Sequence, residues 1–513
     1  MKKEKLLALY LVIAFVIVGS LVGFNILRLN YASNSEENQD QKENEPPEED
    51  DNNEEDAPSE ENNNEPTDHD NSDSTENEIN TNYNETEQPS FIILIGDGMG
   101  FSHIQLGNLV EYGENKSSWL YDFPYITNIS TENYYEQITD SAAAGTAIAT
   151  GYRTGNKKIS VDINGTNLNT ILEIAEEKGY HTGLVVSSDM RHATPAAFAA
   201  HNKSRENSFD IGRDMANQGV ELLFGGGERY DLFGQQVDYM VNDLGYNYIT
   251  NKSELENLNQ LKTLGLFAEN GLMREMERKE NTSKPSLYEM SLKAIKLLEN
   301  EKSPYFLMIE GSQIDWACHN NDKIYLAHEM IAFEKIVRKV RELAIKDPTL
   351  QVLITADHET GGLSINSYEF STEIPKENDS LAILIEKRSN RTNEVDVSWS
   401  SKGHTNKKVI LSGVGAFTEP ILNASHLTDI FSMVYNGINY NISIKQTAKF
   451  DDSQRKFVLD STFYFRSPSF KDLTKRIFYG FDRKRFFKFL YISVWGLDIP
   501  CKMIDKKSLF YDL

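Results

Sequence analysis

The chain has 513 residues and a formal net charge of -26 at pH 7. This length leaves room for one large domain or for two to three ordinary ones. The acidic balance argues against a nucleic-acid-binding protein, which would carry a basic face, and two cysteines are too few for a disulfide framework.

The first residues are built like a membrane anchor. Lysines at positions 2, 3 and 5 precede a run from Leu6 to Leu27 that carries no charge. A run of about 22 residues can cross a bilayer as a helix, with the lysines inside. The sequence predicts a cytoplasmic segment 1–5 and a transmembrane signal-anchor 6–27, with the rest of the chain outside the cell. A cleaved signal peptide, and hence secretion, is the alternative.

Residues 28–89 are predicted to form a disordered acidic linker. From Ser33 to Ser90 there are about twenty acidic residues against the single Lys42, and few apolar side chains. Such a segment cannot bury enough surface to offset its ordering entropy. We expect an extended spacer that holds the next domain clear of the membrane; a cation-binding role is the alternative.

From Phe91 short apolar runs alternate with longer amphipathic ones, which indicates βαβ units on a mostly parallel sheet. The predicted strands are Phe91–Ile95, Thr182–Ser187, Tyr305–Ile309 and Gln351–Thr355. The predicted helices are Ser141–Thr150, Leu168–Lys178, Leu287–Leu298 and Lys323–Ala344, followed by an amphipathic stretch at Leu427–Tyr435. Residues 90–440 are therefore expected to form one α/β domain, a mostly parallel central sheet flanked by helices on both faces.

The tail, residues 441–513, is basic and aromatic, as in the run from Lys484 to Phe489. Its apolar stretch Phe489–Leu497 is too short to span a bilayer. We expect a poorly folded extension of unassigned role; a segment that lies on an anionic membrane surface is the alternative.

Acidic residues and histidines follow three predicted strands. Since binding crevices in open α/β sheets form at the carboxyl ends of the strands, we expect these side chains to converge. They are Asp97, then Glu310, Asp315 and His319, then Asp357, His358 and Glu359. Asp315 and His319 are four residues apart, so on a helical turn they share a face and can bind one ion. Either pair alone is more often an ordinary surface pairing, but their joint placement favours a metal centre.

Ser141 is the candidate nucleophile. It stands at the start of a helix rich in small residues, where free amides and the positive helix end attract an anion. The simpler interpretation of a serine at this place is a helix N-cap.

Six motifs in order give a specific resemblance. They are Gly96-Asp97-Gly98-Met99-Gly100, Asp140-Ser141-Ala142-Ala143, His192-Ala193-Thr194-Pro195, Glu310-Gly311-x-x-Ile314-Asp315-x-x-x-His319, Thr355-Ala356-Asp357-His358-Glu359-Thr360-Gly361-Gly362 and Gly403-His404-Thr405. Together they resemble the alkaline phosphatase family from about Phe91 to Asn439.

The resemblance implies two zinc ions and a third ion, magnesium in most relatives. One zinc would be held by Asp315, His319 and His404. The second would be held by Asp357 and His358, with Asp97 and Ser141 completing it. The third ion would share Asp97 and take Thr194 and Glu310. His192 and Trp316 stand at positions that vary in the family beside the third site, which leaves the identity of that ion open.

The resemblance further implies hydrolysis of small phosphomonoesters through a phosphoserine on Ser141. Arg205 would bind phosphate and Asp140 would orient Arg205, and the enzyme would scavenge phosphate outside the cell. Sulfatases are disfavoured because residues 141–145 lack the C/S-x-P-x-R setting, and phosphodiesterases commonly use threonine and lack an equivalent of Arg205. A surface cation-binding protein with a decayed catalytic core is the alternative from another class.

The family resemblance also implies a homodimer. Short spacings in this chain, about a hundred residues from the Arg205 region to Tyr305 and about forty from Gly362 to His404, leave little room for the insertions of longer relatives. They favour a smaller dimer interface or a monomer.

Overall fold

The computed structural model describes residues 88–439 apart from 115 and 229–234, together with five strands beyond residue 442. The expected anchor 6–27 and all but the last two residues of the expected linker 28–89 lie outside the described residues. No helix in the described part is both long and apolar enough to cross a membrane.

A nine-stranded sheet organises the domain, in the order β2-β13-β8-β1-β7-β3-β4-β6-β5. All pairings from β8 to β5 are parallel, whereas β13 runs antiparallel to both β8 and β2. The strands are β1 Ser90–Gly96, β2 Tyr125–Ile129, β3 His181–Asp189, β4 Leu222–Gly226, β5 Asn247–Ile249, β6 Thr263–Leu266, β7 Tyr305–Gly311, β8 Leu350–Thr355 and β13 Val409–Val414.

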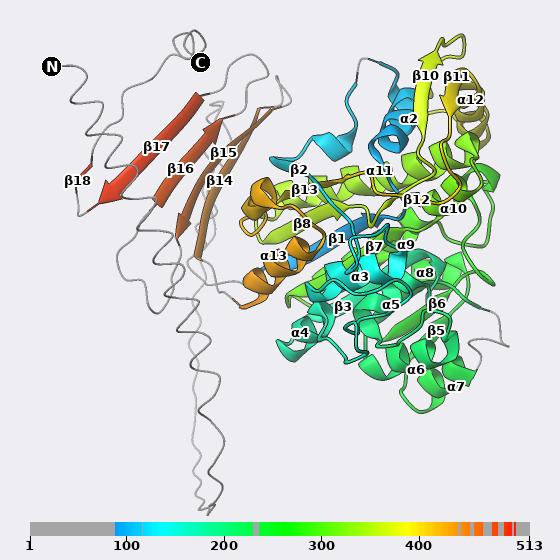
Figure 1. The fold of residues 1–513 in the computed structure, drawn as a ribbon, viewed down its shortest axis with the longest axis horizontal. Helices are drawn as coiled ribbons and strands as arrows, with labels where there is room; N and C mark the ends of the chain where they lie inside the picture. Colours follow the sequence, from blue (N-terminus) through cyan, green and yellow to red (C-terminus); the bar gives the residue numbers. More distant parts are fainter. Residues whose placement is uncertain are drawn as a thin grey trace, which may run out of the picture. The chain divides into compact units, whose positions relative to one another are not determined.

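Helices pack on both faces of the sheet (Figure 1). α9 and α11 contact the central strands, and α2, α10 and α12 pack against α11. α4 also contacts the sheet, and α3, α5 and α13 pack against α4. Their bounds are α2 Phe101–Tyr112, α3 Ser141–Thr150, α4 Ile171–Glu177, α5 Ala193–Ala199, α9 Leu287–Asn300, α10 Gln313–His319, α11 Lys323–Lys346, α12 Leu381–Asn393 and α13 Thr428–Asn439. Three further helices nearer β5 are α6 Ser208–Gln218, α7 Gln235–Asn242 and α8 Lys252–Asn257, and 3-10 turns occur at Trp119–Tyr121, Glu275–Glu277 and Glu419–Asn423.

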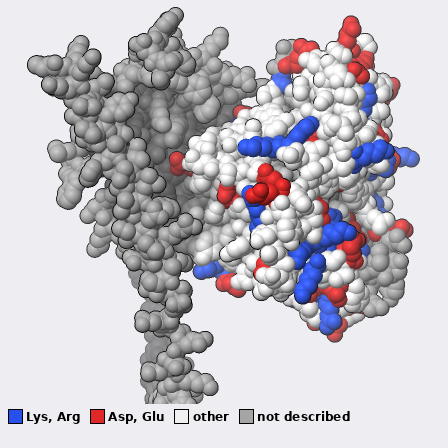
Figure 2. All heavy atoms as spheres, viewed as in Figure 1, with Lys and Arg blue, Asp and Glu red and all other residues white. Residues whose placement is uncertain are grey.

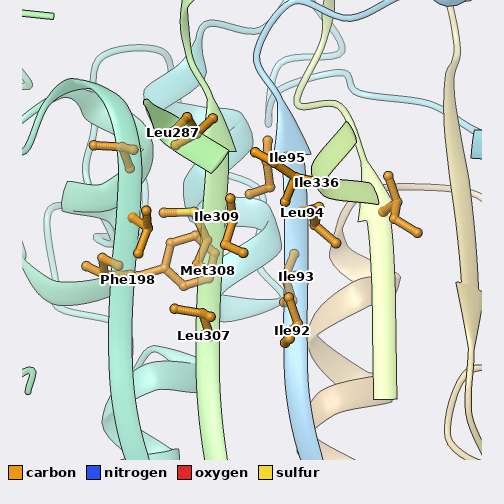
Figure 3. Close-up of a cluster of buried hydrophobic side chains, with 14 of the residues drawn as sticks. Ile92, Ile93, Leu94, Ile95, Phe198, Leu287, Leu307, Met308, Ile309 and Ile336 are labelled. Atoms are coloured by element: carbon orange, nitrogen blue, oxygen red, sulfur yellow. The ribbon is translucent and has the colours of Figure 1, made fainter. Parts of the chain in front are cut away.

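The core explains why the central strands are apolar without alternation. Ile92, Ile93, Leu94 and Ile95 are each 0% exposed on β1, and the side chains of β7 from Leu307 to Ile309 lie beside them (Figure 3). A strand covered by helices on both faces buries every side chain, at about 1.5–3 kcal/mol each.

The predicted fold class is confirmed, and each predicted strand and helix lies within a few residues of an observed one. The largest helix difference is α4, which begins at Ile171 because the Thr170 side chain caps it and Glu173 completes a capping box. The antiparallel β13 and its neighbour β2 were not predicted, since their pairing with the sheet is not encoded locally.

Two short antiparallel strand pairs lie outside the main sheet. β9 Glu359–Thr360 pairs with β12 His404–Thr405, and β10 Ser364–Tyr368 pairs with β11 Val395–Ser398. The first pairing sets His404 opposite Thr360 and so joins two of the sequence motifs.

In the tail, the described segments form a separate antiparallel sheet, β14 Ser443–Asp451, β15 Lys456–Tyr464, β16 Lys475–Gly480, β17 Phe487–Val494 and β18 Leu497–Asp498. The expectation of a poorly folded extension of unassigned role stays a prediction.

Candidate metal centre and nucleophile

The carboxyl ends of four neighbouring parallel strands deliver the candidate site residues. Asp97 follows β1, Glu310 is the sixth residue of β7, Asp357 follows β8, and His192 caps α5 just beyond β3. Because β8, β1, β7 and β3 are adjacent, the predicted convergence at one edge of the sheet is observed.

Asp315, His319 and His404 bring their donor atoms together. Nε2 of His319 lies 3.2 Å from Oδ2 of Asp315 and 3.2 Å from Nε2 of His404. Nε2 of His404 lies 3.7 Å from Oδ1 of Asp315. The helical turn predicted for residues 315–319 is α10, so the two side chains share a face as expected.

The outer ring nitrogens of both histidines face main-chain carbonyl groups. Nδ1 of His319 lies 2.5 Å from the carbonyl oxygen of Lys402, and Nδ1 of His404 lies 2.9 Å from that of Thr139. A carbonyl oxygen only accepts, so Nδ1 carries the hydrogen in each ring. The lone pair of each Nε2 is therefore free to bind a metal and is directed at Asp315 and the other histidine, which is the arrangement found in metal-binding histidines.

The Nδ1 of His358 also faces a hydrogen-bond acceptor, in this case the side chain of Thr360. Thr360 donates its hydroxyl hydrogen to Asp315 at 2.6 Å and lies 3.2 Å from Nδ1 of His358, which can donate to it. Nε2 of His358 then faces Asp357 Oδ2 at 3.2 Å and Asp97 Oδ1 at 3.6 Å. Asp97, Asp357 and His358 each offer one donor atom within 4.8 Å of the others, and so do Asp315, His358 and His404.

Buried carboxylates without hydrogen-bond partners argue for a cation here. Both oxygens of Asp97 and of Glu310, and Oδ2 of Asp357, have no hydrogen-bond partner among the described residues. Burial, with the nearby Asp357 carboxylate, raises the pKa of Asp97 well above its usual value, and burial raises the pKa of Glu310 to about 8. Ionised groups this deeply buried require compensating positive charge, which a divalent ion supplies. The residues therefore fit a metal centre.

A third group shares Asp97 with the second. Asp97, His192 and Glu310 hold donor atoms within 4.8 Å of one another, and the buried hydroxyl of Thr194 has no partner among the described residues. The expected third site is thus brought together, and the structure adds the His192 ring to it, which the sequence had set beside the site.

Trp316 lies edge-on to His192, with ring centroids 6.2 Å apart. Burial and the adjacent Arg205 charge lower the pKa of His192 to about 4, so its ring is neutral near pH 7. A neutral imidazole has a single lone-pair nitrogen, so the His192 ring can either accept a hydrogen bond from Arg205 or bind a cation, but not both at once.

Gly98, in the first motif, permits the close approach of the fourth and fifth motifs, which contain Asp315 and Thr360. Its φ is +73°, and a Cβ there would stand 2.9 Å from both the Cα of Asp315 and the hydroxyl of Thr360. Its amide donates to Oδ1 of Asp357 at 3.0 Å. Only glycine combines this conformation with this contact.

Ser141 is the first residue of α3 and is buried. Its Oγ lies 3.4 Å from Nε2 of His358. Asp140 is the N-cap, with Oδ1 accepting from the amide of Ala143 at 3.0 Å, so Ser141 does not cap the helix. The simpler interpretation of Ser141 is therefore wrong, and its hydroxyl points toward the metal-binding donors at a helix N-terminus that favours anions.

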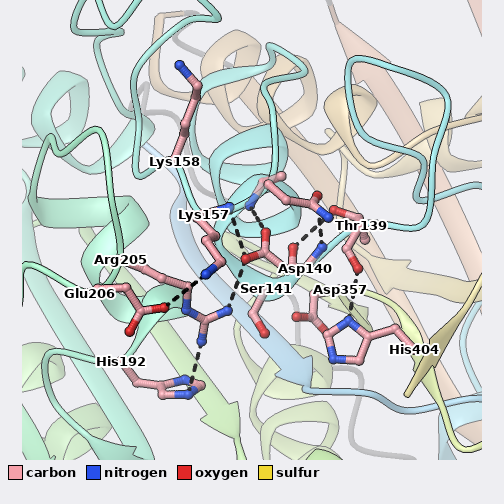
Figure 4. A network of polar contacts seen from close by, with 12 residues as sticks. Thr139, Asp140, Ser141, Lys157, Lys158, His192, Arg205, Glu206, Asp357 and His404 are labelled. Carbon is pink, nitrogen blue, oxygen red and sulfur yellow. Dashed lines mark hydrogen bonds and ion pairs between the residues drawn. The ribbon is translucent and has the colours of Figure 1, made fainter.

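Arg205 faces Ser141 from the loop between α5 and α6 (Figure 4). Its Nη1 donates to Oδ2 of Asp140 at 3.3 Å and its Nη2 lies 3.2 Å from Nε2 of His192. The guanidinium is thus held by two side chains while the remaining N–H groups stay available to a planar oxyanion.

Sequence reasoning gave no role to Thr139, Thr360, Lys402, Asn156 and Lys157, although Thr360 lies inside a quoted motif. All five form hydrogen bonds to site residues that are not their neighbours in the sequence. Thr139, Lys402 and Lys157 bond through their main-chain atoms. Asn156 bonds through its side chain to a main-chain amide, and Thr360 bonds through its hydroxyl group. A local pattern carries no signal for such contacts.

Comparison with known proteins supports this reading. Residues 89–408 match the family model described as Alkaline phosphatase. The chain is 38% identical over 296 residues to alkaline phosphatase 4 of Bacillus subtilis (strain 168), a match that covers 54% of this chain and 62% of that protein. It is 31% identical over 425 residues to alkaline phosphatase 3 of the same organism, covering 70% of this chain and 91% of that protein.

Solved structures agree. The cold-active alkaline phosphatase of the psychrophile Shewanella sp. is 28% identical, with a TM-score of 0.60 over 68% of this chain and 99% of that chain. Alkaline phosphatase from the Antarctic bacterium TAB5 is 27% identical, with a TM-score of 0.59 over 69% of this chain and 99% of that chain. A variant of the TAB5 enzyme holds Mg in its M3 site.

Proposed function

The chain belongs to the alkaline phosphatase family, and we propose that it hydrolyses small phosphate monoesters through a phosphoserine on Ser141. The observation that carries the proposal is the meeting of three features at one edge of the sheet. They are the buried hydroxyl of Ser141, the guanidinium of Arg205 and the two clusters of metal-binding donors around His358.

Two zinc ions and one magnesium ion fit the three donor groups. Imidazole with carboxylate suits zinc, which supports Asp315, His319 and His404 for one ion and Asp357, His358, Asp97 and Ser141 for the other. Asp97, Glu310 and Thr194 offer oxygen ligands that suit magnesium, as in the TAB5 variant, while His192 at this position favours zinc as the alternative. When bound, these cations neutralise the dianionic phosphate and lower the pKa of hydroxyl groups beside them.

Arg205 binds two oxygens of the phosphoryl group and so fixes the phosphorus atom before Ser141. Asp140 keeps the guanidinium in place, and His192 can accept a hydrogen bond from it while its ring binds no cation. Ser141 then loses its proton to solvent, its Oγ forms a bond to phosphorus, and the bond from phosphorus to the substrate oxygen breaks, so that the departing alkoxide takes a proton from water and leaves as the alcohol. Water cleaves the resulting phosphoserine, which releases inorganic phosphate and restores the serine hydroxyl.

The substrate class follows from the contacts that the site can make. Ser141, Arg205 and the metal-binding residues all serve the phosphoryl group, which supports broad specificity toward small phosphomonoesters. Basic and acidic side chains are interspersed on the visible face of the described domain (Figure 2), whereas a nucleic acid requires basic residues gathered together.

Outside the cell, such an activity would scavenge phosphate. The uncharged run 6–27 supports anchoring to the cell membrane with the catalytic domain extracellular, and secretion after cleavage is the alternative. Fractionation of cells and sequencing of the mature N-terminus distinguish the two. The family supports a homodimer, which sedimentation of the purified chain tests.

The activity is tested with the full chain and a chromogenic aryl phosphate at alkaline pH. Hydrolysis should require zinc and magnesium, disappear on chelation and return on adding the metals. A bis-aryl phosphate diester serves as the comparison substrate and should be cleaved far more slowly. A folded, zinc-loaded chain that cleaves neither substrate contradicts the proposal, and preference for the diester reassigns the chain to the phosphodiesterases.

A further inference from the structure

The turn after α3 connects the nucleophile to Arg205 through the main chain of Lys157. The amide of Lys157 donates to Oδ2 of Asp140 at 3.0 Å, and its carbonyl oxygen accepts from the amide of Arg205 at 2.7 Å (Figure 4). One residue therefore touches both the carboxylate that holds the guanidinium and the backbone that carries it.

The side chain of Asn156 holds the segment that precedes Ser141. Its Oδ1 accepts from the amide of Asp140 at 3.2 Å and from Nδ2 of Asn133 at 2.9 Å. Its Nδ2 donates to the carbonyl oxygen of Ile138 at 3.0 Å. Asn156 is exposed, so it contributes through these three hydrogen bonds and hardly through packing.

Lys157 adopts a left-handed backbone conformation, with φ of 70°. This conformation is uncommon for a residue with a side chain and persists only where the surroundings impose it. The lysine side chain does not explain it, because its one polar contact to another described residue is an exposed ion pair of Nζ with Glu206 at 3.5 Å, with side chains 65% and 69% exposed. Such a pair stabilises little, whereas the strained backbone makes the two contacts to Asp140 and Arg205.

We propose that Asn156 and Lys157 are positioning residues for phosphate binding, which act through Asp140 to fix the guanidinium of Arg205 relative to Ser141. Asp140 is held from three sides. Asn156 holds its amide, Lys157 holds Oδ2, and the start of α3 holds Oδ1. Without Asn156 the carboxylate can shift, and the fork of Arg205 shifts with it. This inference rests on the proposed phosphatase function.

A double-mutant cycle between Asn156→Ala and Arg205→Ala tests the proposal. Binding of inorganic phosphate to the zinc-loaded full chain is measured by calorimetry, which needs no turnover. Asn156→Ala should weaken binding about three- to tenfold in the wild-type background, the equivalent of a lost hydrogen bond, and should change it little once Arg205 is absent. The amides of Lys157 and Arg205 should also exchange hydrogen faster in Asn156→Ala.

Asn257→Ala is the matched control, since Asn257 is an exposed asparagine on α8 with one hydrogen bond, to the carbonyl oxygen of Ser253. It should leave phosphate binding and both exchange rates unchanged. An equal loss of phosphate affinity from Asn156→Ala with and without Arg205 overturns the positioning role. If the wild type hydrolyses and binds phosphate while Asn156→Ala matches it, the inference alone is wrong. If the zinc-loaded wild type neither hydrolyses phosphomonoesters nor binds phosphate, the proposed function fails and this inference with it.

Discussion

His404 donates its Nδ1 hydrogen to the main-chain carbonyl oxygen of Thr139, across 2.9 Å and 265 positions of sequence. Thr139 lies two residues before Ser141, so one hydrogen bond connects the β9–β12 pairing to the start of the nucleophile helix. This hydrogen bond links the candidate metal-binding residues to the candidate nucleophile, and substitutions on either side are expected to affect both.

Ser141→Ala should abolish turnover and keep phosphate affinity. Removal of a catalytic nucleophile lowers kcat by at least about 10³-fold, while Arg205 and the metal donors remain to bind phosphate. Acid quenching after mixing with a labelled phosphomonoester should trap phosphate on the wild type and none on the variant. Turnover of the variant at the wild-type rate would exclude Ser141 as the nucleophile.

Arg205→Lys should lower kcat/KM on the order of 10²-fold, because lysine cannot bind two phosphoryl oxygens at once. Most of the loss should appear as a higher KM and a weaker inhibition by inorganic phosphate. Arg213→Lys, at an exposed position on α6, is the control and should behave as wild type. If Arg205→Lys kept the wild-type kcat/KM, as Arg213→Lys is expected to do, the positive charge alone would account for the role of Arg205.

Gly98→Ala should weaken zinc binding by about 10- to 100-fold, since the new Cβ meets Asp315 and Thr360 at 2.9 Å. Competition with a chromogenic chelator measures the change. Gly179→Ala separates steric contact from backbone strain, because Gly179 has φ of +80° with nothing within 4 Å. It should lose about 1 kcal/mol of stability and keep its zinc affinity. Weaker zinc binding in both variants would point to strain.

Glu329→Gln should stabilise the protein at alkaline pH. Burial, with the adjacent Glu275 carboxylate, raises the pKa of Glu329 to about 8, and Arg278 and Arg274 offset this only in part. The folded-state pKa lies above the unfolded one, so the folded form binds more protons and stability falls as pH rises from about 4.5 to about 8.

The amide of Glu275, which donates to Oε1 of Glu329 at 2.9 Å, keeps an acceptor in the glutamine variant. Thermal or urea unfolding should show a gain of about 2 kcal/mol at pH 9 and little change at pH 5. Glu342→Gln, at a more exposed position on the same helix, should show neither. A gain of the same size at both pH values would assign the effect to packing.

His201 should carry a positive charge in the folded state near neutral pH. Its Nδ1 lies 2.9 Å from the carbonyl oxygen of Ser160 and its Nε2 lies 2.8 Å from Glu173, and both partners only accept. Burial opposes the charge, but these hydrogen bonds raise the pKa of His201 above its usual value. The stability that the charged His201 ring contributes is complete below about pH 6.5 and is lost as pH rises through the raised pKa.

Glu173→Gln should therefore reduce stability by about 1 kcal/mol at pH 6 and by less at pH 9. Urea unfolding at the two pH values measures the difference. Glu177→Gln, exposed on the same helix, is the control. A loss that does not depend on pH would assign the effect to the capping contact between Glu173 and the Thr170 amide instead of a charged His201.

Several site features could be predicted because they are local. The i, i+4 spacing of Asp315 and His319 requires a helical turn, and α10 supplies it. The unbroken apolar runs before Asp97 and Asp357 predicted strands covered on both faces, and β1 and β8 are such strands. The rule that parallel strands share a carboxyl edge then predicted the convergence.

Other features could not be predicted because they depend on residues far apart in the chain. The left-handed turn at Lys157 contacts Asp140 and Arg205 from a segment with no chemical signature of its own. Thr360 became a link between Asp315 and His358 only when β9 paired with β12.

The sequence by itself determined the fold class and the family and predicted the candidate residues for metal and phosphate binding, because periodicity, spacing and ordered motifs are local properties of a chain. Only the tertiary structure decided which histidine nitrogen faces inward, that His192 joins the third donor group, and what holds Arg205 in place. Those outcomes depend on hydrogen bonds between distant segments, whose geometry exists only once the sheet has brought the segments together.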